Sequence, residues 1–201
     1  MDWVTTTQVL EDLKESNDIL AWTSFRNHFY PVIFNFAKTL GLSATDAEDA
    51  TQETMLAFLK AFRDGKYDRE KGQFSHWLFG VARRVILNFR KRLPRKQFSA
   101  DNTTGTFFLD TIADESEVRH TWDTEWRYMV LERCLWQARR ELDQKVFNAF
   151  ELYALSQKPV DEVCRILGMS RNAVYIAKSR VLSKLRQLQQ DFEGFNKDSI
   201  L

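Results

Sequence analysis

The residues best suited to binding chemistry lie between Arg165 and Arg186, near the C-terminal end of the chain. This stretch contains six basic side chains and no acidic one: Arg165, Arg171, Lys178, Arg180, Lys184 and Arg186. Positive charge without interspersed acids favours docking on the phosphates of DNA. The sequence therefore predicts a DNA-binding surface here, and the competing interpretation is the solvated face of an ordinary helical hairpin.

Apolar residues in the same stretch have the spacing of a helix-turn-helix motif. On the first expected helix, one face is apolar at Val160, Val163, Cys164 and Leu167. Pro159 suits the first turn of this helix, where the helix dipole favours the two acids that follow it. Gly168 can adopt a positive φ and end the helix, and Ser170 can cap the next one by accepting a backbone N–H. A three-residue turn over 168–170 is the result.

The second helix of this motif is expected to have two distinct faces. Its buried stripe comprises Val174, Ala177, Val181, Leu185 and Leu188. The opposite side, called the reading face below, comprises Asn172, Ile176, Ser179, Arg180 and Ser183. Arg180 can bind guanine bidentately and Ile176 can contact a thymine methyl group, so this face can discriminate base pairs. A phosphate contact is the alternative for Arg180.

Three further basic residues flank the reading face. Arg171 and Lys184 lie towards its edges, which predicts that they contact phosphates. Lys178 lies nearer the buried stripe, which predicts either a phosphate contact or packing of its aliphatic stem. Base contacts are therefore assigned to the reading face and phosphate contacts to its flanks.

A second candidate surface lies on a helix predicted from about Ala44 to Phe62. One stripe of this helix, spaced i, i+3, i+4 and i+7 and called the acidic stripe below, is formed by Asp49, Gln52, Glu53 and Leu56. Two acids beside an exposed leucine suit a basic protein partner. The alternative is ordinary solvation, because the helix dipole favours acids near the N-terminal end.

A third candidate surface lies on a helix predicted from about Phe74 to Leu93. Its buried residues are expected to be Leu78, Ala82, Val85, Ile86 and Phe89. The other side, called the aromatic–basic face below, carries Trp77, Arg83, Arg84, Asn88, Arg90 and Lys91. Unpaired DNA needs a stacking platform, charges for the backbone and a reader of base edges, and this face supplies all three. Partial burial in the core is the alternative for Trp77.

The loop that precedes this helix, from about Arg63 to Gln73, is polar and contains two glycines. A mobile loop beside a basic helix could hold a single displaced base. The simpler interpretation is a connector, which is the usual role of such a composition.

Helical spacing recurs almost throughout the 201 residues, which include only seven glycines and three prolines, so an all-α fold is predicted. Further helical segments are expected over about 7–40, with a bend or break at Pro31, over 124–141 and over 143–155. Charge is segregated, with seven basic residues over 83–96 and seven acidic residues over 101–125. We expect a first domain of residues 1–94, an acidic linker of 95–121 and a second domain of 122–201, with a frayed tail from Asp191.

The chain offers no constellation for catalysis or metal binding. Cys134 and Cys164 lack metal-ligand spacing, and core packing explains them better. His28, His76 and His120 are far apart in sequence, so an enzyme, a cofactor and a metal site are not expected. No apolar run has membrane-spanning length and the N-terminus lacks a signal-peptide core, so a cytoplasmic protein is expected.

Taken together, these features resemble the sigma-70 family, and most closely its minimal two-domain class, the extracytoplasmic-function (ECF) sigma factors. Region two looks like LGLSATDAEDATQETMLAFLKAF followed by YDREKGQFSHWLFGVARRVILNFRKR, and region four looks like VDEVCRILGMSRNAVYIAKSRVLSKLR. The resemblance covers about residues 21–190. It implies a promoter-specificity subunit that binds RNA polymerase core, recognises the minus-ten and minus-thirty-five elements and promotes DNA melting.

The resemblance also implies a role for each candidate surface. The acidic stripe matches the surface that binds the clamp helices of the polymerase β′ subunit. Residues 66–74 and the face of Trp77, Arg84 and Asn88 match the elements that capture and melt the minus-ten element. The minus-thirty-five element would meet Arg171, Asn172, Tyr175, Ile176, Ser179 and Arg180. The polymerase β flap is a further implied partner, and the resemblance admits an anti-sigma factor as another.

Two positions depart from the family pattern. Arg84 stands where the family commonly has an asparagine, and Tyr175-Ile176 replaces a Lys-Ser pair that many members have. The role implied by the resemblance survives these changes, whereas the promoter sequence that is read does not follow from the family.

The second interpretation of the chain is a stand-alone transcriptional regulator. Such a protein would bind duplex DNA through its helix-turn-helix and use the N-terminal half for sensing or dimerisation. It would need neither the acidic stripe nor the aromatic–basic face. Co-purification with RNA polymerase core separates the two interpretations, because only a sigma factor requires it.

Overall fold

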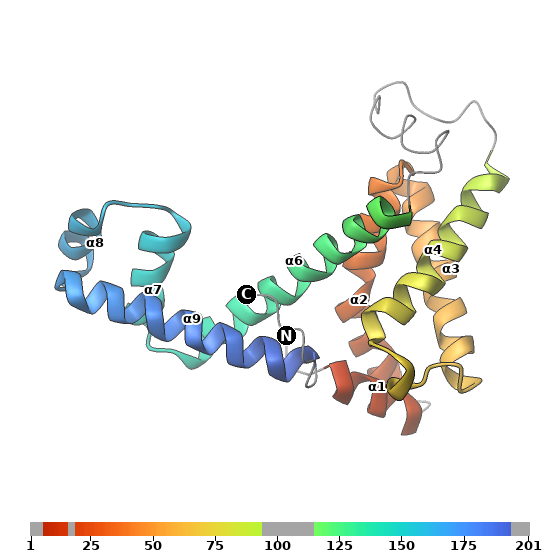
Figure 1. The fold of residues 1–201 in the computed structure, drawn as a ribbon, viewed down its shortest axis with the longest axis horizontal. Helices are drawn as coiled ribbons and strands as arrows, with labels where there is room; N and C mark the ends of the chain where they lie inside the picture. Colours follow the sequence, from red (N-terminus) through yellow and green to blue (C-terminus); the bar gives the residue numbers. More distant parts are fainter. Residues whose placement is uncertain (1–5, 16–18, 94–114, 194–201) are drawn as a thin grey trace. The chain divides into compact units, whose positions relative to one another are not determined.

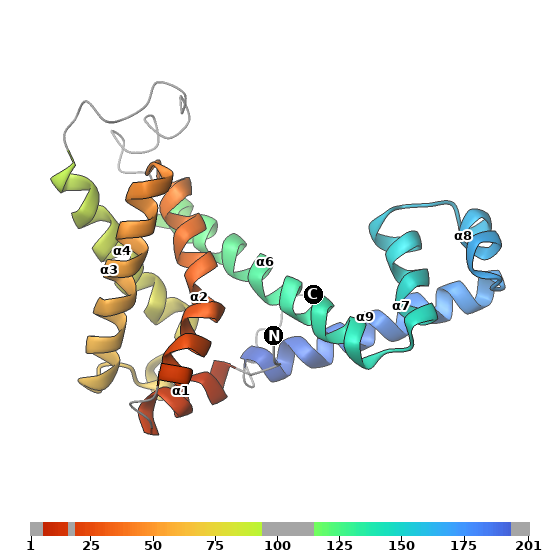
Figure 2. The same cartoon turned by 180° about the vertical axis from the view of Figure 1, so that it is seen from behind.

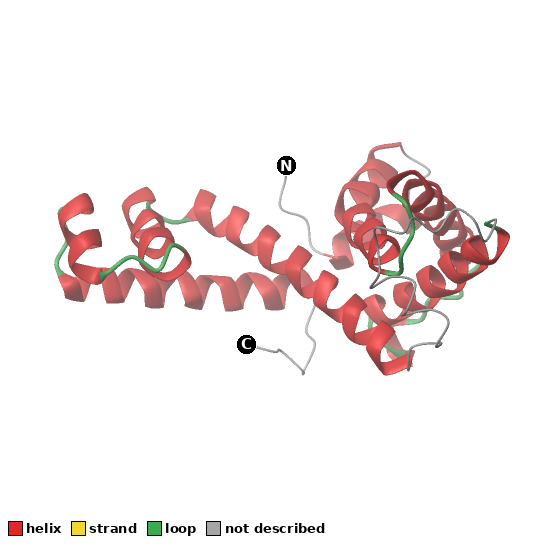
Figure 3. Ribbon diagram, turned by 90° about the horizontal axis from the view of Figure 1, so that it is seen from above, coloured by secondary structure: helices red, strands yellow, loops and turns green. Residues whose placement is uncertain are grey.

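The structure is a computed structural model that describes residues 6–15, 19–93 and 115–193. Every regular element in those ranges is a helix (Figure 3), which confirms the all-α prediction. The chain forms two compact units, an N-terminal unit of Val9–Met129 and a C-terminal unit of Val130–Leu201 together with Met1–Gln8. Most of the expected linker, over 95–114, lies outside the described residues.

The N-terminal unit contains most of α1 (Thr6–Glu15) and all of α2 (Ile19–Thr39), two helices in the stretch predicted to be helical (Figure 1). Pro31 lies inside α2, and the helix continues through it, so of the expected bend or break the break does not occur. A proline in a helix interior removes one backbone hydrogen bond and is costly. Here Phe29, Val32 and Ile33 are all buried beside it, and their burial offsets that cost.

The next two helices, α3 (Ala44–Arg63) and α4 (Phe74–Arg92), have bounds close to the predicted ones. Gly41 has a φ of 87° after α2, and the Oγ of Ser43 accepts the N–H of Asp46 at 3.1 Å, which caps α3. A single 3-10 turn, Arg69–Lys71, lies between the two helices. Figures 1 and 2 show α2, α3 and α4 side by side, and α3 contacts both of its neighbours.

Aromatic rings fill the core of the N-terminal unit. Phe25 of α2 stacks on Phe58 of α3 with ring centroids 4.0 Å apart. Phe29, at the centre of the cluster, also contacts Phe74 of α4 at 5.1 Å. The predicted core residues Leu78, Ala82 and Ile86 of α4 are buried, whereas Val85 and Phe89 are half-buried. Phe25, Phe29 and Phe36 of α2 are fully buried in this core, whereas Trp22, Tyr30 and Phe34 are half-buried.

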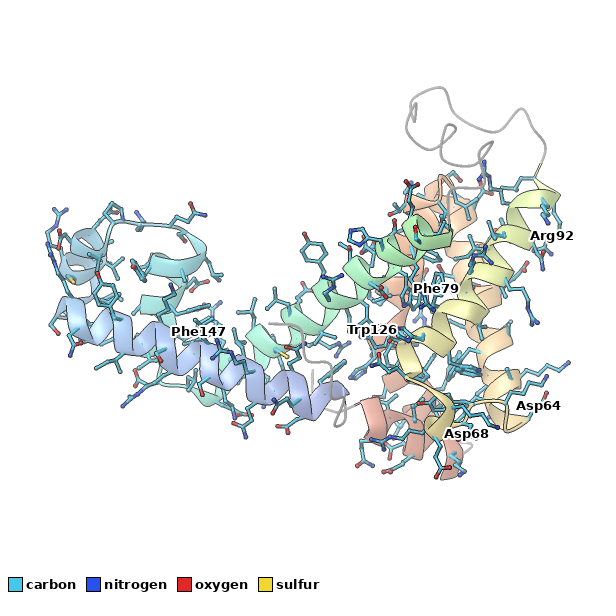
Figure 4. The ribbon with its side chains drawn as sticks, in the orientation of Figure 1. Asp64, Asp68, Phe79, Arg92, Trp126 and Phe147 are labelled. Carbon is cyan, nitrogen blue, oxygen red and sulfur yellow. The ribbon has the colours of Figure 1, made fainter. Side chains whose placement is uncertain are left out.

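The first half of α6 (Glu115–Glu141) completes that core. Residues 115–121 are therefore helical where a linker was expected, and the C-terminal unit begins at Val130 instead of at residue 122. Trp126 stacks on Phe29 at 5.6 Å, and Trp122 meets Phe36 edge-on at 5.2 Å. Figure 4 shows Phe79 and Trp126 where α4 and α6 approach each other. One apolar side chain per turn of this segment is buried: Val118, Trp122, Trp126 and Met129. The many acidic residues around them led to the prediction of a linker.

The C-terminal unit contains the rest of α6, followed by α7 (Gln144–Phe150), α8 (Val160–Leu167) and α9 (Arg171–Glu193). A π-helical turn, Glu151–Leu155, continues α7, so the helical stretch predicted over 143–155 is confirmed. α7 packs along α9, and Phe147 and Phe150 of α7 are buried. Phe192 near the end of α9 is buried, so the helix extends past Asp191, where fraying was expected.

Candidate nucleic-acid interface

The turn between α8 and α9 has the geometry that the sequence predicts. Gly168 is left-handed, with φ 58° and ψ 47°, and its backbone N–H donates to the carbonyl oxygen of Cys164. The Oγ of Ser170 accepts the N–H of Ala173 at 3.2 Å, which satisfies one of the first N–H groups of α9. These two caps end α8 and begin α9 at the predicted residues, so the helix-turn-helix is confirmed.

The two faces of α9 divide as predicted. The five residues of its expected apolar stripe are buried: Val174, Ala177, Val181, Leu185 and Leu188. All five residues of the reading face are exposed: Asn172, Ile176, Ser179, Arg180 and Ser183. Ile176 is a large apolar side chain with 45% of its area exposed. An apolar contact beside polar and charged groups is the mixture that base-edge recognition uses.

Arg171, at the first position of α9, is held by a carboxylate. Its Nε and Nη2 donate to the two oxygens of Asp161, at 2.6 and 2.7 Å. This bidentate pair raises the pKa of Arg171 and ties the start of α9 to the first turn of α8. Nη1 of Arg171 takes no part in this bidentate pair.

Lys184 and Lys178 are engaged differently from one another. Lys184 forms an ion pair with Glu141 at the end of α6, and the hydrogen bond from Lys184 lowers the pKa of that carboxyl. Lys178 is exposed, and its ammonium lies 5.5 Å from the centre of the Tyr153 ring. Tyr175 meets the same ring edge-on at 5.7 Å. The structure therefore places Lys178, rather than Lys184, on the open side of α9.

On α4, the aromatic–basic face is partly open. Arg84, Asn88 and Lys91 are exposed, whereas Arg83 and Trp77 are half-buried. The Trp77 ring lies 5.1 Å from that of Tyr67 and 5.6 Å from that of Phe58. Trp77 thus packs partly in the core and stays half-exposed, as its alternative interpretation allows.

The loop before α4 is more ordered than a plain connector. Asp68 accepts the backbone N–H of Glu70 at 2.9 Å and forms an ion pair with Lys71 at 3.0 Å. The hydrogen bond from Lys71, followed by that from Glu70, lowers the pKa of the Asp68 carboxyl. Burial raises the pKa of the Tyr67 hydroxyl, which lies in the same loop. These contacts order the loop beside Trp77, and Figure 4 labels Asp64 at its start and Asp68 before the 3-10 turn.

The acidic stripe on α3 faces solvent. Asp49 and Gln52 are exposed, and Leu56 has 64% of its area exposed. Glu53 is half-buried because its Oε2 accepts Nη2 of Arg92 at 2.6 Å. Figure 4 labels Arg92 at the C-terminal end of α4.

Sequence reasoning missed the three partners of these side chains: Arg92, Asp161 and Glu141. Arg92 and Glu53 are 39 residues apart, and Arg171 and Asp161 are 10 apart, so neither pair has the i, i+4 spacing of one helix. A bidentate partner for Arg171 could have been suspected only from the acid in the first turn of the preceding helix.

Other features of the described residues are plain. They contain no group of three or more histidine, cysteine and acidic side chains placed to hold a metal ion. Cys134 is buried, and Cys164 is half-buried on the apolar side of α8. Across 6–15, 19–93 and 115–193, no helix is long and apolar enough to cross a membrane.

Two family comparisons bear on this arrangement. Sigma-70 region 2 matches residues 25–96, and sigma-70 region 4 matches residues 132–185. No curated protein matches the chain. Together the two family matches cover more than half of the chain, and they fall on the two structural units.

One match on each structural unit, region 2 and region 4, defines a promoter-recognition protein. The chain belongs to the sigma-70 family of RNA polymerase sigma factors, in its ECF class. Its partners are accordingly RNA polymerase core and promoter DNA. Members of this family are regulatory DNA-recognition proteins rather than enzymes.

Proposed function

We propose that this sigma factor uses three separate surfaces in initiation. The acidic stripe binds the clamp helices of the polymerase β′ subunit, and the C-terminal unit contacts the β flap. The aromatic–basic face of α4 and the loop over 66–74 capture and melt the minus-ten element. The reading face of α9, with Arg171 and Tyr175, recognises the minus-thirty-five element.

The exposure of Leu56 carries most of the argument for the core-binding surface. A leucine with 64% of its area in water lies one turn beyond Glu53 and two beyond Asp49 on the same stripe. Solvation of acids near a helix N-terminus explains Asp49, but it does not explain an exposed leucine in line with them. An apolar side chain flanked by acids suits a partner with basic residues around an apolar contact.

The melting surface is supported by the exposed cations of α4. Arg84 and Lys91 can hold the backbone of a single strand, and the half-exposed rings of Trp77 and Tyr67 offer a platform on which a base can stack. Asn88, exposed on the same face, can donate to and accept from a base edge. These are the groups that a separated strand requires and that a duplex-binding regulator does not.

The experiment that tests the core-binding surface is a pull-down of the full-length chain with purified RNA polymerase core. We expect Asp49→Arg and Leu56→Ala each to weaken core association, and the double variant to abolish it. Glu48→Arg is the matched control, because Glu48 is an exposed acid on α3 outside the stripe. Equal retention of core by the parent, the control and the double variant would remove the stripe from the interface.

A further inference from the structure

A hollow of about 280 Å³ lies beside the reading face of α9. It is lined by Tyr153, Tyr175, Lys178, Ser179, Leu182 and Arg186. All of these except Leu182 carry a hydrogen-bond donor, and two of them are cations. Such a lining accepts an anion with several oxygens.

The hollow is built by one stripe of α9 and one residue from the π-helical turn. Tyr175, Ser179, Leu182 and Arg186 recur at i, i+4, i+7 and i+11, which places them on one side of the helix. Tyr153, from the turn Glu151–Leu155, closes the other side. Its ring supports the ammonium of Lys178 at 5.5 Å and contacts the ring of Tyr175.

The basic residues of α9 that lie at the hollow differ from the others in their ion pairing. Arg171 and Lys184 are each held by a carboxylate, from Asp161 and Glu141. Lys178 and Arg186 form no ion pair within the residues that the structure describes. Since α9 has no acid between Arg171 and Gln190, nothing on the helix opposes an anion there.

The position of the hollow identifies the anion. Ser179 belongs to both the reading face and the hollow, so whatever fills the hollow lies directly beside bases read by α9. A helix in the major groove has a phosphate backbone along each edge. We propose that the hollow binds the phosphodiester backbone of one DNA strand, with Lys178 and Arg186 as its charged ligands and Tyr153 positioning Lys178.

This inference rests on the proposed reading of the minus-thirty-five element by α9. It moves the main phosphate contacts from the side of Lys184 to the side of Lys178 and Arg186. It also gives the π-helical turn a role, because the turn brings Tyr153 to the recognition helix.

The test measures binding of the full-length chain, assembled with RNA polymerase core, to duplex DNA selected by the parent from a randomised upstream element. Affinity is followed over a range of salt concentrations. We expect Lys178→Ala and Arg186→Ala each to make the slope of log affinity against log salt shallower by about one, and the double variant by about two. The order of preference among sequences should stay that of the parent, because phosphates carry no sequence information.

Two further variants make the result specific to the hollow. Lys145→Ala removes one exposed cation at the start of α7, outside the hollow, and should leave the salt slope unchanged. Tyr153→Ala should reduce the slope as Lys178→Ala does, whereas Tyr153→Phe, which keeps the ring, should keep the slope of the parent. Circular dichroism of each variant shows that the helical fold is retained.

The outcomes separate this inference from the function on which it rests. If the parent selects an upstream sequence but the double variant keeps the parental salt slope, phosphate binding in the hollow is overturned and reading of the minus-thirty-five element by α9 stands. A changed order of base preference in Lys178→Ala or Arg186→Ala also overturns it, because the residue would then contact bases. A parent that shows no sequence preference upstream overturns both.

Discussion

Nη2 of Arg92 lies 2.6 Å from Oε2 of Glu53, which joins the basic end of α4 to the acidic stripe of α3. The two side chains are half-exposed, at 60% and 44% of their areas. Arg92 of α4, the helix that we assign to the minus-ten element, is thus paired with an acid of the surface that we assign to polymerase. A partner that binds Glu53 must compete with Arg92 for it.

This competition predicts the direction of one substitution. Arg92→Gln should strengthen association with core, because Glu53 no longer leaves an internal partner. Exposed ion pairs contribute about 0.2–1 kcal/mol, so the gain is at most about fivefold in affinity. Glu53→Gln should weaken association, and the double variant should resemble Glu53→Gln. Titration of labelled protein with core measures all three, and stronger binding by Glu53→Gln would contradict the assignment.

The aromatic–basic face predicts different behaviour for its two most informative residues. Arg84 is exposed, so Arg84→Ala should change the free energy of unfolding by less than about 0.5 kcal/mol while reducing open-complex formation. Trp77→Ala should reduce open-complex formation and also lower the free energy of unfolding by about 2 kcal/mol, because its ring packs on Phe58 and Tyr67. Permanganate reactivity of the promoter reports melting, and Lys60→Ala, an exposed cation on α3, is the control. Parental reactivity for Arg84→Ala would mean that this face does not touch separated strands.

The reading face predicts a loss of selectivity at one base pair. Arg180→Ala should cost about 1–3 kcal/mol on the preferred sequence and relax preference at a single position, because arginine can bind guanine bidentately. Selection from a randomised upstream element at two salt concentrations measures both effects. An equal loss on every sequence, with a change only in salt dependence, would assign Arg180 to a phosphate.

The pair of Lys184 and Glu141 predicts a pH-dependent contribution to stability. The pKa of Glu141 is lowered in the folded protein, so the contribution is present above the unfolded carboxyl value of about 4.3 and is lost as pH falls through the lowered value. Lys184→Ala should therefore lower Tm at pH 7 more than at pH 3, while the salt slope of DNA binding stays that of the parent. A slope shallower by about one would restore Lys184 as a phosphate contact.

Local patterns sufficed for the helix-turn-helix, because each of its features depends on residues close together in sequence. Gly168 needs a positive φ, Ser170 caps the next turn, and five apolar residues at helical spacing bury one side of α9. The same reasoning placed the acidic stripe and the exposed positions of the reading face.

Features that depend on contacts between distant residues could not be predicted. Trp122 and Trp126 pack on Phe36 and Phe29, which lie roughly 90 residues earlier, and the acids around them masked one apolar side chain per turn. The ion pair between Lys184 and Glu141 likewise joins two helices, so Lys184 alone looked like a free cation. The charge of a segment can be counted from the sequence, whereas the ion pairs that its side chains form depend on how the helices pack.

The most direct test of the account is transcription by purified RNA polymerase core, with and without the full-length chain, on templates with randomised promoter DNA. We predict that transcripts appear only when the chain is present, and that their templates share two conserved elements at a fixed spacing. We also predict that Asp49→Arg with Leu56→Ala abolishes these transcripts, whereas Glu48→Arg does not. Selection of the same DNA by the chain without core, and no promoter-specific transcripts with core, would contradict the account and identify a stand-alone DNA-binding regulator.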